Sequence, residues 1–96
     1  MLMSYEIEFK ETALKEWKSL DGSIKTIFKK KLKKVIENPR IPANQLSGMS
    51  NCYKIKLREA GYRLVYQVND EVITIFVISV GKRERLKVYK EAKKRL

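Results

Sequence analysis

The chain has 96 residues, 44% of them hydrophobic, which suffices for one compact domain with its own core. It has one cysteine and no histidine, so an internal disulfide is excluded and the usual nitrogen and sulfur ligands of a zinc site are missing. Lysine and arginine number 22 against 11 acidic residues, and the resulting net charge of +11 favours a polyanionic partner such as RNA, DNA or an anionic membrane.

The first third of the chain predicts a strand followed by two helices. Residues 4–10 alternate polar and apolar side chains, the period of a half-buried strand. Apolar residues then recur at helical spacing over residues 13–20 and again over 24–36, and Asp21-Gly22-Ser23 supplies a stop for the first helix and an N-cap for the second. The second helix should end before Asn38-Pro39. Its apolar stripe consists of Ile24, Ile27, Phe28, Leu32, Val35 and Ile36, with the lysines largely outside it.

An irregular loop, NPRIPANQLSGM, leads from the second helix to a predicted β-hairpin over residues 53–68. If Ala60-Gly61 forms a two-residue loop, Arg58 pairs with Arg63 and Leu57 with Leu64, so every apolar pair lies on one face. The other face then collects basic side chains, which repel one another unless an anion lies over them. These basic residues are Lys54, Lys56, Arg58 and Arg63.

The run from residue 72 to 80 is almost continuously apolar and β-branched, which predicts an inner strand covered on both sides. With Asn69-Asp70 as the preceding turn, Ile73, Ile75 and Val77 would share the core face. Phe76 would then lie beside Arg63 and provide an aromatic floor for the basic face.

After Gly81 comes a basic segment and then a short helix, whose contact stripe we expect to include Val88, Ala92 and Leu96. Residues 1–96 therefore predict a single α+β domain of order β-α-α-β-β-β-α, with a helical hairpin packed on a mostly antiparallel four-stranded sheet. No apolar run approaches the roughly 20 residues that cross a bilayer, and no signal-peptide core is present. We expect a cytoplasmic protein that binds nucleic acid rather than a membrane.

Two long segments, CYKIKLREAGYRLVYQV and VISVGKRERLKVY, together with the early LKEW and the NPRI loop, closely resemble the RelE toxins of bacterial type II toxin–antitoxin pairs. The likeness covers nearly the whole chain. It implies a ribosome-dependent endoribonuclease, working without a metal or cofactor, that cleaves messenger RNA in the ribosomal A site and so inhibits translation. It also implies contact with small ribosomal subunit RNA, a cognate RelB-like antitoxin that wraps the toxin, and contact with DNA only through the toxin–antitoxin complex.

Position by position, the resemblance places the functional residues of the family on Lys54, Lys56, Arg63, Arg83 and Tyr89. The chain departs from the family at Ser47, just before Gly48, where relatives carry a basic residue that helps to hold RNA. This departure bears on affinity or substrate placement rather than on chemistry. Arg85 is expected to matter less than Arg83.

RNA cleavage without a metal needs a base for the 2′-hydroxyl proton, cations for the pentacovalent phosphorane and help for the departing 5′-oxygen. Without histidine, the proton transfers fall to lysine, tyrosine, a carboxylate or the RNA itself. A lysine crowded by cations loses some proton affinity, and a tyrosine among cations has its phenolate favoured. Our hypothesis is that Tyr89 is the general base or a base-stacking platform, with Lys54 as a competing base or acid. Lys56 and Arg83 would clamp the phosphorane, and Arg63 would lie near the leaving oxygen.

The same residues have plainer structural explanations. A solvated strand face accounts for Lys54, Lys56 and Arg58, packing accounts for Tyr89, and the lysines of the second helix fit a solvated face or generic contacts with ribosomal RNA. Two other function classes stay open. One is a non-enzymatic nucleic-acid-binding module or ParE-like gyrase poison, against which the five-residue set argues. The other is a role as half of a DNA-binding repressor complex, which can coexist with cleavage.

Overall fold

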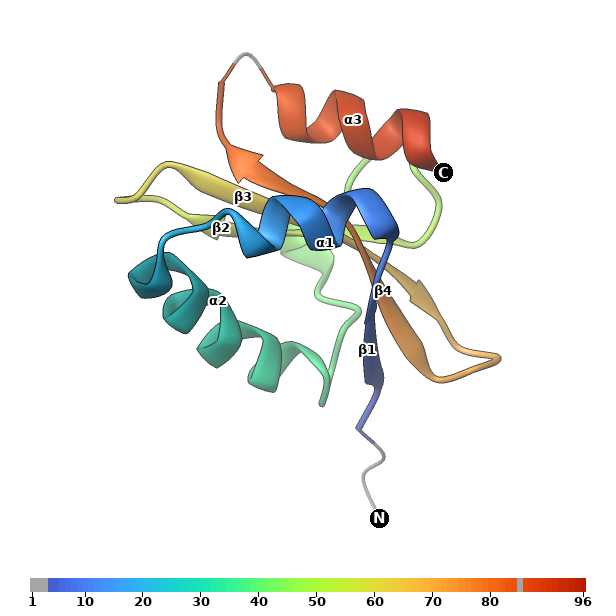
Figure 1. Cartoon of the computed structure of the whole chain (residues 1–96). Coiled ribbons are helices and arrows are strands. Elements are labelled where there is room, and N and C mark those ends of the chain that lie inside the picture. The colour runs from blue at the N-terminus through green and yellow to red at the C-terminus, as the bar shows by residue number, and fades with distance from the viewer. Residues whose placement is uncertain (1–3, 85) are drawn as a thin grey trace.

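The computed structural model describes residues 4–84 and 86–96, which form a four-stranded mixed sheet with helices on both faces (Figure 1). The strands are β1 (Glu6–Phe9), β2 (Cys52–Leu57), β3 (Tyr62–Asn69) and β4 (Thr74–Lys82), and the helices are α1 (Glu11–Lys18), α2 (Gly22–Val35) and α3 (Lys87–Arg95). The strand order is β1-β4-β3-β2, with β1 parallel to β4 and the other pairs antiparallel. The predicted α+β class, the element order and the inner position of β4 are confirmed.

The helices α1 and α2 cover one face of the sheet and bury their apolar stripes against it. Phe28, Leu32 and Val35 of α2 are buried in the same cluster as Leu64, Tyr66, Ile75 and Val77 of the strands. Ile27, predicted on this stripe, is instead 41% exposed, because it lies at the margin of the stripe beside the turn after β2. At the start of α2, Asp21 occupies the N-cap position, but its carboxylate accepts a hydrogen bond from the Ser23 hydroxyl at 2.7 Å rather than from the helix backbone.

The β2–β3 hairpin has a different register from the predicted one. Leu57 pairs with Tyr62 and Lys56 with Arg63, so the connecting loop has four residues, 58–61. The loop closes because the Gly61 N–H donates to the Leu57 carbonyl at 2.8 Å while Gly61 adopts a φ of +71°, a conformation that glycine tolerates. The predicted pairing of Arg58 with Arg63 is therefore wrong, and Arg58 lies in the turn. Since the register differs by two residues and side chains alternate with period two, the predicted faces are preserved.

The beginning of β4 also differs from the prediction. The turn before it spans four residues, 70–73, so Ile73 lies in the turn with a φ of +45° rather than in the strand. In this turn the Asn69 side chain accepts a hydrogen bond from the Glu71 N–H at 3.0 Å. Because of this register Phe76 pairs with Gln67, and the partner of Arg63 is Gly81. The predicted aromatic floor beside Arg63 is therefore wrong, and the Phe76 ring instead carries the Lys10 ammonium 5.3 Å from its centroid.

A bulge in β4 interrupts the simple alternation of side chains. Val65 pairs with Ser79 while Tyr66 pairs with Val77, which leaves Ile78 as an extra residue. Ile75 and Val77 face the α1–α2 side, as predicted, whereas Ile78 faces α3. The nearly continuous apolar run gives no sign of such a bulge.

The helix α3 covers the opposite face of the sheet from α1 and α2 over a second, smaller core. Val88 and Ala92 are buried there with Cys52, Val65 and Ile78, and the Ser79 hydroxyl donates to the Val88 carbonyl at 2.8 Å. Leu96, predicted on the contact stripe, is 49% exposed. Among the described residues, no helix is long and apolar enough to cross a membrane.

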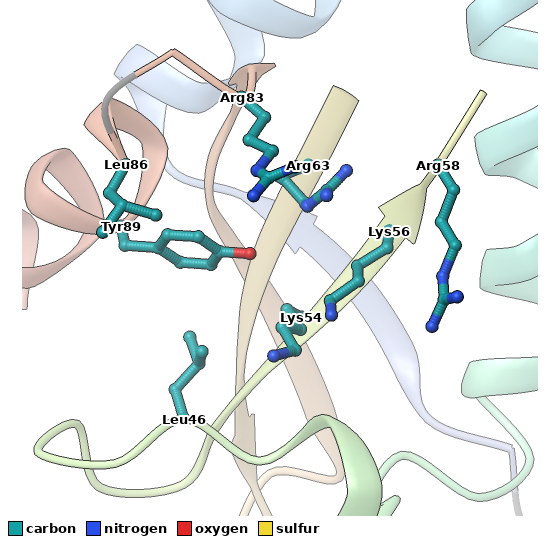
Figure 2. A pocket seen from close by; sticks show the side chains of 8 residues that line it. All are labelled: Leu46, Lys54, Lys56, Arg58, Arg63, Arg83, Leu86 and Tyr89. Carbon is teal, nitrogen blue, oxygen red and sulfur yellow. The ribbon is translucent and has the colours of Figure 1, made fainter. Parts of the chain in front are cut away.

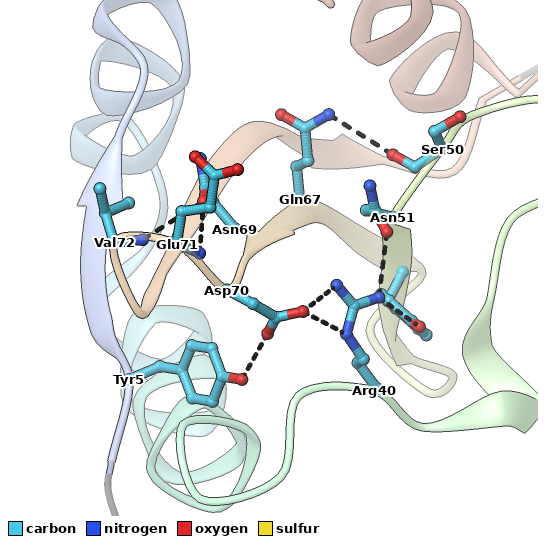
Figure 3. Close-up of polar contacts among 10 residues, drawn as sticks. Tyr5, Arg40, Ser50, Asn51, Gln67, Asn69, Asp70, Glu71 and Val72 are labelled. Carbon is cyan, nitrogen blue, oxygen red and sulfur yellow. Dashed lines mark hydrogen bonds and ion pairs between the residues drawn. The ribbon is translucent and has the colours of Figure 1, made fainter.

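A polar network fastens the loop after α2 to the turn between β3 and β4 (Figure 3). The Arg40 guanidinium donates to Asp70 Oδ2 at 2.7 Å and to Asn51 Oδ1 at 3.1 Å, and the Tyr5 hydroxyl donates to Asp70 Oδ1 at 2.6 Å. The hydrogen bond from Tyr5 and then the bonds from Arg40 hold the pKa of Asp70 below its ordinary value. This network lies at the other end of β3 from Arg63 and braces the fold away from the basic face.

Candidate active site

A concave pocket of about 600 Å³ opens between β2, β3 and α3 (Figure 2). The pocket brings together all five residues that the sequence singled out, although they come from four separate segments of the chain. These residues are Lys54 and Lys56 of β2, Arg63 of β3, Arg83 after β4 and Tyr89 of α3. The remaining lining residues are Leu46, Arg58 and Leu86.

The strands β2 and β3 position three of the cations. Lys54 and Lys56 alternate with the buried Tyr53, Ile55 and Leu57, so both ammonium groups project from the same face. Arg63 lies directly across from Lys56 and is only 6% exposed, with its guanidinium donating to the Tyr62 carbonyl at 2.9 Å.

Arg63 forms no ion pair with any acidic side chain of the described residues. A buried cation without a counter-charge is costly, because burial removes the water that would solvate it. An anionic ligand in the pocket would supply the missing negative charge.

Arg83 and Tyr89 close the pocket from the side of α3. The backbone N–H of Arg83 donates to the Gly61 carbonyl at 2.7 Å, which anchors this segment to the β2–β3 turn while the exposed side chain extends into the pocket. Tyr89 is half-buried against the second core, and its hydroxyl points into the pocket toward the cations (Figure 2). An aromatic ring with a hydroxyl thus faces a cluster of four positively charged groups.

The electrostatics of the pocket favour an anion. Five cationic side chains line it, and no acidic residue does. The pKa of Lys56 is lowered, first because the like charge of Lys54 stands beside it, and further by partial loss of solvent and by Arg58 and Arg63. Lys56 therefore gives up its proton more readily than an isolated lysine does. The site therefore combines fixed cations with a lysine that is ready to donate a proton.

Several lining residues were not predicted. Leu46 and Leu86 supply apolar walls, and neither had a charge or a periodic pattern that marked it, although Leu46 adjoins Ser47. Ser47 itself is exposed and lines a neighbouring depression outside the pocket. Arg85 lies outside the described residues. Within the described residues, no group of three or more acidic residues and cysteines is arranged to hold a metal ion.

Comparison with known proteins identifies relatives of the whole chain. Residues 7–87 match the family described as the ParE toxin of the type II toxin–antitoxin system parDE. The chain is 61% identical over 94 residues to the mRNA interferase toxin RelE of Escherichia coli strain K12, covering 98% of this chain and 99% of the relative. It superposes with a TM-score of 0.90 on a free double arginine-to-alanine variant of E. coli RelE, at 58% identity, covering 98% of this chain and 99% of that one. The toxin in the intact E. coli RelBE toxin–antitoxin complex matches with a TM-score of 0.83 and 60% identity, over 85% of this chain and all of that one.

Proposed function

The chain belongs to the RelE toxin family of type II toxin–antitoxin systems, and from this membership we propose that it is an mRNA interferase, an endoribonuclease toxin that an antitoxin neutralises. The observation that carries the proposal is the convergence of Lys54, Lys56, Arg63, Arg83 and Tyr89 on one pocket without acidic lining residues. A phosphodiester is the anion that such a pocket suits, since several cations surround one phosphate and a tyrosine lies beside them.

The substrate we propose is messenger RNA in the A site of a translating ribosome, which places the protein in the cytoplasm. The net charge of +11 supports contact with RNA, and the exposed lysines of α2 suit non-specific contacts with the RNA of the small subunit. With its RelB-like antitoxin the toxin would form a complex, and only through that complex would it contact DNA.

The reaction begins when the 2′-hydroxyl loses its proton and its oxygen attacks the adjacent phosphorus. Tyr89 takes this proton as a phenolate, or Lys54 takes it as a neutral amine. The new O2′–P bond forms as the P–O5′ bond breaks, which gives a 2′,3′-cyclic phosphate and a 5′-hydroxyl. Each proton removed by the base is balanced by one delivered to the departing oxygen.

The cations act on the charge that accumulates in the phosphorane. Lys56 and Arg83 face the non-bridging oxygens, and Arg63 lies near the leaving oxygen. Because the pKa of Lys56 is lowered by Lys54, Lys56 is also suited to deliver the proton to that oxygen. Removing one cation that acts only in the transition state should slow cleavage by roughly 10²–10³-fold, the magnitude found for oxyanion donors.

A second candidate function is poisoning of DNA gyrase, because the family description that matches residues 7–87 is that of a ParE toxin. The two functions differ in their requirement for ribosomes. Purified protein is added to a translating extract and to naked message, and the 5′ ends of the message are mapped by primer extension. Codon-spaced cuts that need ribosomes are the expected result. Absence of cuts with folded protein, together with loss of gyrase supercoiling activity, would contradict it.

A further inference from the structure

A second groove of about 350 Å³ continues the basic pocket across β2 toward α2. It is lined by Lys31 and Lys34 of α2, by Ile41 and Asn44 of the following loop, and by Lys56 and Arg58. Lys56 and Arg58 line both the groove and the pocket, so the two hollows adjoin at these side chains. Figure 2 shows Arg58 at the end of β2, between that strand and the turquoise ribbon of α2.

The chemistry of the groove is that of a nucleotide site. Four cations line it and no acidic residue does, which suits a phosphate. Apolar side chains, including Ile41, form its walls and offer a surface to the face of a base. The Asn44 amide carries both donors and an acceptor for the edge of a base, and in the described part of the chain its side chain makes no hydrogen bond of its own.

Four of the six lysines of α2 form two pairs that differ in their position around the helix. Lys31 and Lys34 lie on the side that faces β2 and line the groove. Lys29 and Lys33 are also exposed. At 100° per residue, they lie about 100° and 140° around the helix from Phe28, on the opposite side of Phe28 from Lys31 and Lys34. A solvated helix face would not distinguish these two sets, whereas a ligand in the groove would.

We propose that this groove binds a nucleotide that flanks the cleaved step of a single-stranded RNA, with its phosphate on Lys31 and Lys34 and its base against Ile41. The inference rests on the proposed function, because the RNA enters the groove from the pocket. It adds a subsite for the flanking strand, so the length of RNA that the protein engages exceeds the dinucleotide that is cut.

The test measures how binding depends on RNA length. The probes are a fluorescent trinucleotide with a 2′-deoxy residue at the cleaved step, and two hexanucleotides that extend it on the 5′ or the 3′ side. Anisotropy titrations use the full chain, the double variant Lys31→Ala/Lys34→Ala, the matched control Lys29→Ala/Lys33→Ala, and Arg83→Ala. Both double variants lose the same charge from the same helix.

We expect one hexanucleotide to bind the wild type and the matched control more tightly than the trinucleotide does. The groove variant should lose this gain while binding the trinucleotide normally. The slope of its log affinity for the longer RNA against log salt should be shallower by about 0.7, the value for one phosphate contact. Between about 50 and 200 mM salt this difference amounts to roughly 2.6-fold in affinity. Arg83→Ala should weaken all three probes alike.

If the hexanucleotide binds both double variants more tightly than the trinucleotide by the same factor, the subsite is overturned and the proposed cleavage is unaffected. A groove variant that keeps the gain but loses affinity for the antitoxin would assign the groove to that protein and also overturn the subsite. Failure of the wild type to bind any of the probes at about 50 mM salt would also overturn the subsite, since phosphate contacts are strongest at low salt. The proposed function is tested separately, by cleavage of message on ribosomes.

Discussion

The attachment of α3 to the sheet offers a sharp test, because Tyr89 reaches the pocket only while this helix is in place. At the C-terminal end of α3, the Arg95 guanidinium donates to Glu16 Oε1 at 2.7 Å, to Glu16 Oε2 at 3.3 Å and to the Ile78 carbonyl at 2.9 Å. Glu16 Oε1 also accepts from the Val80 N–H at 3.3 Å. The ion pair thus satisfies backbone groups of β4 beyond Val77, where its pairing with β1 ends, and joins α1, β4 and α3.

The expected magnitude follows from this geometry. Hydrogen bonds to charged groups contribute about 1.5–3 kcal/mol each, and breaking a fully buried ion pair costs about 3–5 kcal/mol. The Arg95 side chain is 17% exposed and that of Glu16 is 33% exposed, so water screens the pair in part. We therefore expect Arg95→Met to destabilise the attachment of α3 by about 2–3 kcal/mol.

Hydrogen exchange is the direct assay, because loss of the Arg95 contacts should let α3 open locally. A change of 2–3 kcal/mol corresponds to roughly 30-fold to 150-fold faster exchange of the α3 amides, with β3 amides much less affected. Lys94→Met is the matched control, since this neighbour is exposed and, among the described residues, forms an ion pair with Glu91 alone, at 3.9 Å. A double-mutant cycle with Glu16→Gln should give a coupling of about 1–2 kcal/mol in urea unfolding. Unchanged α3 exchange in Arg95→Met, or a coupling near zero, would refute the attachment.

Three further predictions concern single side chains of the pocket and the second core. Tyr89→Phe keeps the ring and removes the hydroxyl, so cleavage should fall about 10²–10⁴-fold under single-turnover conditions; an unchanged rate would exclude Tyr89 as the base and leave it as a stacking platform. Lys56→Met relieves the repulsion from Lys54 that lowers the Lys56 pKa, so the urea midpoint should rise at low salt and less at high salt while cleavage falls; a lower midpoint would contradict this. Burial raises the pKa of the Cys52 thiol from 9.0 to about 11. Because the thiol of the unfolded chain therefore ionises at lower pH than that of the folded protein, the free energy of unfolding should fall between pH 9 and 11. The thiol should account for about 2–3 kcal/mol of this loss, and Cys52→Ala should lack that component.

The sequence predicted the faces of the sheet better than its loops. Period-two alternation placed Lys54, Lys56 and Arg63 on one face, and the actual register keeps them there because it differs by two residues. The loop length depends on a backbone bond to Gly61 and on the left-handed conformation of that glycine, which alternation does not encode. For the same reason Arg58 was expected in the strand and is found in the turn.

The β4 strand shows a second limit of pattern analysis. Its nearly continuous apolar run does not mark the bulge at Ile78 or the longer turn that precedes Thr74, so the predicted place of Phe76 was wrong. The positions of Arg83 and Tyr89 also follow from contacts made after folding, namely the bond to Gly61 and the packing of α3. Their spacing along the chain did not predict that they would meet at one site, whereas the family resemblance did.

We propose above that one pocket of converging cations and a tyrosine cleaves RNA through attack by the 2′-hydroxyl. The most direct test is the single-turnover cleavage rate of message on programmed ribosomes for Arg83→Ala beside Lys82→Ala, a neighbouring cation that does not line the pocket, with the end groups of the products identified. The account predicts a 2′,3′-cyclic phosphate and a 5′-hydroxyl, a rate lowered roughly 10²–10³-fold by Arg83→Ala, and a near-normal rate for Lys82→Ala. Equal rates for the two variants, or products with a 5′-phosphate, would contradict it.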